Sequence, residues 1–148
     1  MKRSILVAGA LLLGLGGVMA EQDQLKETQT MMKGNGKNAG ALSAIVKGEK
    51  PYDQATVNTA LTQFDDTAKK LPTLFPEGIK GKPFEGDYSP SAKIWEDKAG
   101  FSEHIASFAK AVTDSKDKIK DVDSLKAELS LIGKQCGGCH ETYRIKKT

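Results

Sequence analysis

The chain has 148 residues, of which 39% are hydrophobic and 28% are charged, with 22 Lys and Arg against 19 Asp and Glu. This length suits one globular domain that buries a core of its own. The weak positive balance and the aromatic fraction of 6% argue against nucleic-acid binding, which needs a strong basic field or stacked aromatic side chains.

The N-terminus has the organisation of a secretory signal peptide. Lys2 and Arg3 form a short positive region, and residues 5–19 are apolar or small throughout. Val18 and Ala20 are small residues at the third and first positions before a cut after Ala20. The apolar run is short for a membrane-spanning helix. We therefore expect export with cleavage after Ala20.

Cleavage divides the chain into a signal peptide, residues 1–20, and one mature domain, residues 21–148. It removes two of the 22 basic residues and none of the 19 acidic ones, so the mature domain is nearly neutral. No later segment is long and apolar enough to span a bilayer. The expected product is a small, soluble, exported protein without a membrane span.

The first of four helical stretches runs from about Asp23 to Val46. Its apolar seam steps by sevens through Leu25, Met32, Ala39 and Val46, which keeps these residues on one helix face. The polar and small residues between them leave the middle of this seam thin.

Three glycines, Gly34, Gly36 and Gly40, lie beside the seam. Each interior glycine costs a helix about 1 kcal/mol relative to alanine. Two explanations stay open: the helix breaks between residues 34 and 40, or a bulky group lies against this face and only small residues leave room for it.

The second stretch begins at Asp53, a good N-cap, and ends at Pro72. Residues 72–91 are dense in Pro and Gly and too numerous for a tight turn, so we expect a crossover along the bundle. The apolar stripe of the helix is Val57, Ala60, Leu61, Phe64, Ala68 and Leu71. The crossover residues expected to cover an end of the core are Leu74, Phe75, Ile79 and Phe84.

The third stretch begins near Pro90 or Ser91, and the fourth begins after Asp121 or Asp123, either of which can cap it. The third carries Ile94, Phe101, Ile105, Phe108 and Val112 on one face, and the fourth carries Leu125, Leu129, Ile132, Cys136, Cys139 and His140. The period of two that marks strands is essentially absent. The predicted fold class is all-α, an antiparallel four-helix bundle.

The only two cysteines of the chain stand in the sequence CGGCH at residues 136–140. Cys136, Cys139 and His140 are spaced i, i+3 and i+4, so they share the helix face that points into the bundle. A C-x-x-C disulfide normally opens a helix in a thioredoxin-like βαβ unit, which this chain lacks. A structural zinc needs four ligands, and the only other histidine is His104.

Haem c uses all three side chains: two cysteines form thioethers with the vinyl groups, and the histidine is the proximal iron ligand. Export agrees with this use, because bacteria attach haem c outside the cytoplasm. Gly137 and Gly138 would together cost the helix roughly 2 kcal/mol, and a porphyrin close against this turn explains them. We expect one covalent haem c, anchored by Cys136 and Cys139 and ligated by His140.

The chain resembles the class II c-type cytochromes, the cytochrome c′ family. The resemblance lies in KGEKPYD (47–53), KIWED (93–97) and CGGCHETYR (136–144), and with the helix lengths it covers the mature chain. It implies a four-helix bundle with the haem motif near the C-terminus. In this family, high-spin members leave the sixth iron position open and bind nitric oxide or carbon monoxide, whereas low-spin members place a methionine there and carry electrons.

The resemblance implies the low-spin branch, because Met31 and Met32 occur in the part of the first helix that faces the haem. Met32 falls on the seam of Leu25 and Val46, whereas Met31 is rotated by about 100° toward the flank. Spacing alone is equally compatible with both methionines being core residues. With the resemblance, Met32 is the expected distal iron ligand.

The favoured function is a periplasmic electron carrier rather than an enzyme, with redox proteins of a respiratory or photosynthetic chain as partners. The alternative is a high-spin protein that binds nitric oxide or carbon monoxide. A peroxidase is disfavoured, since the chain has no His or Arg between Glu21 and Pro51 to act on a ligand at an open iron. The resemblance leaves a monomer and a homodimer both open.

Charged residues near the haem motif are weaker candidates. We expect His104 to be solvated or half-buried rather than a ligand. Lys134, Lys146 and Lys147 make this end of the chain basic, which suits either an ordinary polar surface or a docking patch for an acidic redox partner.

Overall fold

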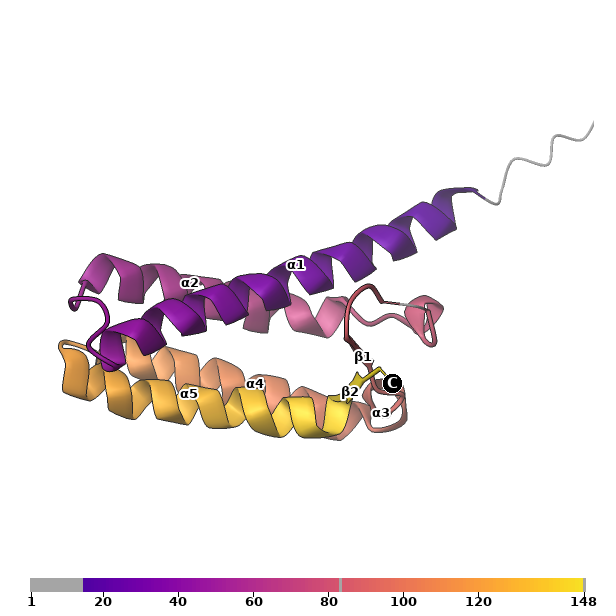
Figure 1. Cartoon of the computed structure of the whole chain (residues 1–148). Coiled ribbons are helices and arrows are strands. Elements are labelled where there is room, and N and C mark those ends of the chain that lie inside the picture. The colour runs from indigo at the N-terminus through magenta and orange to yellow at the C-terminus, as the bar shows by residue number, and fades with distance from the viewer. Residues whose placement is uncertain (1–14, 83, 148) are drawn as a thin grey trace, which may run out of the picture.

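The computed structural model describes residues 15–82 and 84–147. Four long helices, α1 (Leu15–Val46), α2 (Gln54–Lys70), α4 (Lys98–Lys116) and α5 (Val122–Tyr143), form the bundle. Each long helix runs opposite to the one before it in the chain (Figure 1). Helix α1 packs on α2 and α5, and α4 packs on the same two helices. The predicted all-α antiparallel bundle is confirmed.

Two aspartates begin the helices where the sequence predicts N-caps. The Asp53 carboxylate accepts hydrogen bonds from the backbone N–H groups of Ala55 and Thr56 at the start of α2. At the start of α5, Asp121 accepts from the Ser124 N–H, and the Ser124 hydroxyl lies 3.1 Å from the Asp121 N–H. These contacts satisfy backbone donors that a helix start otherwise leaves free.

The apolar faces of the helices pack together in two hydrophobic core clusters. The cluster toward the turn between α1 and α2 consists of Leu42, Ile45, Val57, Ala60, Leu61, Phe64, Ala68, Phe108, Val112, Ile119, Leu125 and Ile132. The cluster toward the crossover consists of Leu71, Ile79, Ile94, Trp95, Phe101, Ile105 and Tyr143. Each fully buried large apolar side chain contributes roughly 1.5–3 kcal/mol, so these two clusters hold the helices together.

Helix α1 differs from its prediction in two ways. It begins at Leu15 rather than near Asp23, so the expected cleavage point after Ala20 lies within it. The rest of the predicted signal peptide, residues 1–14, lies outside the described residues. The helix also runs unbroken through residues 34–40, so a break there is not the reason for the glycines.

The third predicted stretch is two helices, because the chain bends at Asp97. Helix α3 (Lys93–Glu96) ends there, and α4 begins with the Asp97 carboxylate accepting from the Gly100 N–H. The Tyr143 hydroxyl donates to the same carboxylate at 2.9 Å. Asp97 therefore fastens the start of α4 to the end of α5.

The crossover between α2 and α3 contains two short 3-10 helices, η1 (Leu71–Thr73) and η2 (Glu77–Ile79), and one strand, β1 (Tyr88–Pro90). The strand pairs antiparallel with β2 (Arg144–Lys146), which follows α5. The sequence did not predict this ribbon, because three-residue strands carry too little alternation. Among the described helices, none is long and apolar enough to cross a membrane.

Candidate functional site

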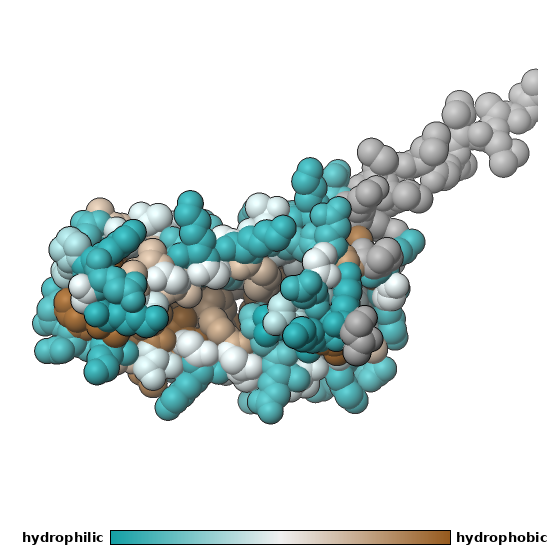
Figure 2. Space-filling model, viewed as in Figure 1, coloured by the Kyte–Doolittle hydropathy of each residue, from teal (hydrophilic) through white to brown (hydrophobic). Residues whose placement is uncertain are grey.

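A cavity of about 530 Å³ opens between α1 and α5, near the crossover end of the bundle. Figure 2 shows the hollow in this face, with apolar side chains lining its depth. Its size falls in the range of about 300–1,000 Å³ that is usual for cofactor sites. Most of the lining is apolar, including Phe64, Phe101, Ile105 and Phe108, so an apolar group fits it better than a polar one.

Helix α5 directs the predicted cofactor residues into this cavity. Cys136, Cys139 and His140 all line it, each half-buried, and the two cysteines are not joined in a disulfide. Burial raises the pKa of both thiols. Burial, and then the charge of Arg144, lower the pKa of His140, which favours the neutral imidazole that binds a metal through a nitrogen lone pair.

Helix α1 supplies the opposite wall. Met32 lines the cavity, whereas Met31 is not among the described lining residues. Met31, which the sequence places on the flank of the seam, lies off the cavity and is 9% exposed. Since α1 contacts both α2 and α5, its buried arc is wider than a single seam. Gly36 and Ala39 continue the wall.

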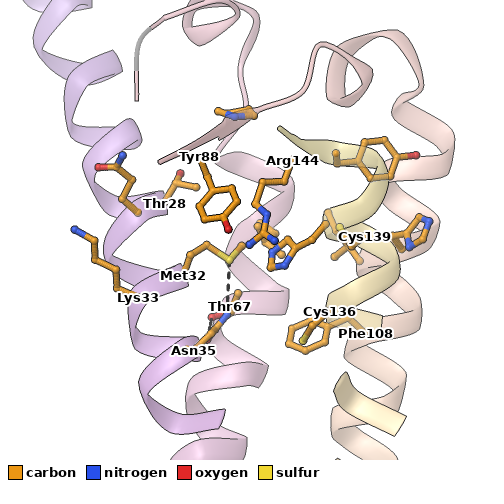
Figure 3. Close-up of a pocket in the computed structure, with 18 of the residues that line it drawn as sticks. Thr28, Met32, Lys33, Asn35, Thr67, Tyr88, Phe108, Cys136, Cys139 and Arg144 are labelled. Carbon is orange, nitrogen blue, oxygen red and sulfur yellow. Dashed lines mark hydrogen bonds between the residues drawn. The ribbon is translucent and has the colours of Figure 1, made fainter. Parts of the chain in front are cut away.

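The crossover and the C-terminal strand close one end of the cavity. The Arg144 guanidinium lies over the Tyr88 ring, 4.2 Å from its centroid, and both residues line the cavity (Figure 3). The crossover is fastened to α1 by Gln29, whose side-chain amide donates to the Glu85 carbonyl at 2.8 Å. No sequence pattern singled out Tyr88, because the strand β1 that positions it is only three residues long.

The wall toward α4 includes His104, which is half-buried as expected. Its ring packs against that of Tyr143 with centroids 5.5 Å apart. Burial and the hydrogen bond to Asp97 raise the pKa of Tyr143 to about 12, so its hydroxyl stays a donor. A side chain at Gly138 would lie 3.6 Å from the His104 ring, so this part of α5 passes close to α4.

The residues present fit haem c. Two thiols and an imidazole from neighbouring turns of α5 line an apolar cavity. The Met32 thioether lies on the wall across from Cys136 and Cys139 (Figure 3). The four residues predicted from the sequence, Met32, Cys136, Cys139 and His140, therefore line one cavity. Soft sulfur and imidazole donors are those that haem iron takes in cytochromes.

Comparisons with known proteins agree with this fit. The family model of cytochrome c′ matches residues 23–144. Cytochrome c-556 of Rhodopseudomonas palustris is 58% identical over 148 residues, which cover 99% of each chain. Cytochrome c′ of the same organism is 38% identical over 142 residues, which cover 96% of this chain and 95% of that protein.

The similar structures point the same way. The structure of oxidised R. palustris cytochrome c556 has a TM-score of 0.77 at 57% identity, and covers 86% of this chain and 99% of its own. R. palustris cytochrome c′ has a TM-score of 0.77 at 36% identity, with 85% and 98% covered. These matches confirm the family resemblance and one covalent haem c. The chain belongs to the cytochrome c′ family, the class II c-type cytochromes of electron transport.

Proposed function

We propose that this protein is a periplasmic, low-spin electron carrier in which His140 and Met32 would bind the haem iron. Cys136 and Cys139 hold the haem through thioethers. The observation that carries the proposal is the position of Met32, a thioether on the α1 wall of the cavity whose α5 wall bears His140. The 58% identity with a cytochrome c-556 supports it.

The bound haem supplies the one-electron chemistry, by cycling its iron between the ferric and ferrous states. The residues of the chain set how easily this occurs. A methionine thioether is a soft ligand, so Met32 favours the ferrous state and raises the reduction potential. The apolar lining from Phe64, Phe101 and Phe108 excludes water and disfavours the more highly charged ferric form.

The alternative is a high-spin protein with an open sixth position that binds nitric oxide or carbon monoxide. The 38% identity with a cytochrome c′ supports this reading. The two functions differ in whether the sixth position of the haem iron would have a ligand from the protein. A far-red charge-transfer band in the oxidised protein reports a methionine–ferric iron bond, and an open site reports itself by carbon monoxide binding to the reduced protein.

Substitution of each methionine tests the proposal. We expect the wild type to show the far-red band and to ignore carbon monoxide. Met32→Ala loses the band, binds carbon monoxide and has a lower reduction potential, because the ferrous iron has lost its soft ligand. Met31→Ala keeps the band and loses only stability through the cavity it leaves. Loss of the band in Met31→Ala alone would assign the ligand to Met31, and no change in either variant would refute methionine ligation.

The periplasmic location rests on the signal sequence of residues 1–20, supported by the haem c chemistry of the family. Cleavage after Ala20 removes the first turns of α1 and leaves the cavity wall intact, because Met32 lies three turns further on. We expect the haem-loaded protein from a periplasmic fraction to begin at Glu21 in peptide mapping. A haem-loaded protein that retains Met1 would contradict the cleavage.

A further inference from the structure

The side chain of Asn35 bridges the predicted distal ligand and helix α2. Its amide nitrogen Nδ2 lies 4.0 Å from Met32 Sδ, at the long end for an N–H···S contact. Its oxygen Oδ1 lies 2.9 Å from Thr67 Oγ1 and 3.4 Å from Gln63 Nε2. Figure 3 shows Asn35 beside Thr67, with the line of contact running on to Met32.

The partners on α2 favour one orientation of the Asn35 amide. The Thr67 hydroxyl has one proton. It donates this proton either to Asn35 Oδ1 or to the backbone carbonyl of Gln63, each at 2.9 Å. The Gln63 amide is a second donor toward Oδ1. With the Thr67 hydroxyl donating to Oδ1 and the Gln63 amide as a second donor, the oxygen lies on the α2 side. The NH₂ group is left facing Met32 and the cavity.

Asn35 lowers the intrinsic stability of helix α1, but the polar groups that it joins are all hydrogen-bonded. Asparagine is a poor residue for a helix interior. Thr67 is 1% exposed, so its hydroxyl must be hydrogen-bonded to avoid a desolvation penalty. Gly34 leaves room for the Gln63 side chain, because a Cβ there would lie 3.3 Å from Gln63 Nε2. One of the three glycines thus has a reason in this contact.

We propose that Asn35 is a positioning residue that donates a hydrogen bond to the Met32 thioether, held in that orientation by Thr67 and Gln63. This inference rests on the proposed function, since it takes Met32 to be the iron ligand. A hydrogen bond to the sulfur draws electron density away from it, which weakens its bond to ferric iron more than to ferrous iron. Asn35 therefore raises the reduction potential.

Asn35→Leu tests this, because leucine has nearly the same shape without a donor. We expect the ferric–ferrous equilibrium to shift toward the ferric form by roughly two- to tenfold, the range of one hydrogen bond. Tenfold corresponds to about 59 mV for a one-electron couple. The far-red band remains, since Met32 is still present. The matched control is Asn38→Leu, on the same helix, whose amide donates to the Gly34 carbonyl at 3.0 Å and should leave the potential unchanged.

Two further measurements keep the test independent of how well Asn35→Leu folds. Thr67→Val removes the hydroxyl that faces Asn35 Oδ1, and we expect a smaller shift in the same direction. In the reduced wild type, which is diamagnetic when low-spin, the Asn35 side-chain NH₂ protons should show a nuclear Overhauser effect to Met32.

The outcomes separate the two proposals. If the wild type lacks the far-red band, methionine ligation fails, and this inference fails with it. If the wild type has the band but Asn35→Leu has the same potential as Asn38→Leu, only the role of Asn35 is refuted. Absence of the nuclear Overhauser effect in a protein that has the band also refutes it.

Discussion

Cys136 and Cys139 are the only thiols of the chain, and both line the cavity. We therefore expect covalent attachment of the haem to depend on these two side chains, one thioether each. Serine is close to cysteine in size but cannot form a thioether, so it removes the bond with little change in packing.

Replacing both cysteines with serine should abolish haem retention after acid–acetone extraction, whereas the wild type keeps one haem per chain by mass. Each single substitution should keep the haem through one remaining thioether. Haem retention in the double variant would refute the assignment of the anchors. A wild-type protein that folds fully without haem and has a Cys136–Cys139 disulfide would refute it as well.

The shared cavity face of Cys136, Cys139 and His140 could be predicted from the sequence, because the three residues lie within two turns of one helix and their spacing alone fixes it. The contacts of Met32 could not. Asn35 and Thr67 are 32 positions apart, and Thr67 is a polar residue within an apolar stripe. Only the packing of α1 on α2 brings them together.

Helix α1 has a glycine, Gly36, where it borders the cavity. Gly36 and Gly40 are both exposed helix residues, and a Cβ at either would meet nothing within 4 Å. Only Gly36 lines the cavity. The unbroken helix leaves the second explanation for Gly36, that a bulky group lies against it.

Gly36→Leu should therefore lower the fraction of purified protein that carries haem, because the new side chain enters the cofactor space. Gly40→Leu is the matched control and should load normally, since it makes the same change one turn away. The ratio of haem to protein absorbance measures loading. Equal loading in the two variants would mean that Gly36 does not make room for the haem.

At the start of α4, Gly100 has no free space for a side chain, unlike Gly36 and Gly40. A side chain at Gly100 would meet the Asp97 carboxylate and, at 2.6 Å, the Tyr143 hydroxyl, which are hydrogen-bonded to each other. Alanine gains about 1 kcal/mol in helix propensity, but overpacking costs about 1–3 kcal/mol, so the loss should prevail.

We expect Gly100→Ala to lower the Tm and Gly40→Ala to raise it, the latter by the propensity gain of about 1 kcal/mol. Thermal unfolding followed by circular dichroism on the haem-loaded proteins measures both. If Gly100→Ala raised the Tm as Gly40→Ala does, the contact between Asp97 and Tyr143 would not limit this position.

At the scale of the whole molecule, the ribbon of β1 and β2 and the turn after α1 lie at opposite ends of the bundle (Figure 1). The ribbon joins residues 88–90 to residues 144–146. The end of the cavity is therefore closed only when the crossover and the segment after α5 are both in place. Its pairing depends on the crossover meeting the end of α5, and no local pattern in either segment predicts that.

Charge near the cavity should control how fast charged redox partners react with the protein. Lys134 lies between Gly133 and Gln135, which line the cavity, and Lys146 follows the lining residue Arg144 by two positions. Because the net charge of the chain is only +3, the local field should exceed the effect of net charge. The double substitution Lys134→Glu/Lys146→Glu should slow oxidation of the reduced protein by ferricyanide, an anion, at low salt. The difference from the wild type should fade as the screening length falls to about 10 Å near 0.1 M salt.

The control Lys47→Glu/Lys50→Glu makes the same charge change at the opposite end of the bundle and should slow the reaction much less. Equal slowing by the two pairs would mean that net charge, and not a patch beside the haem, sets the rate.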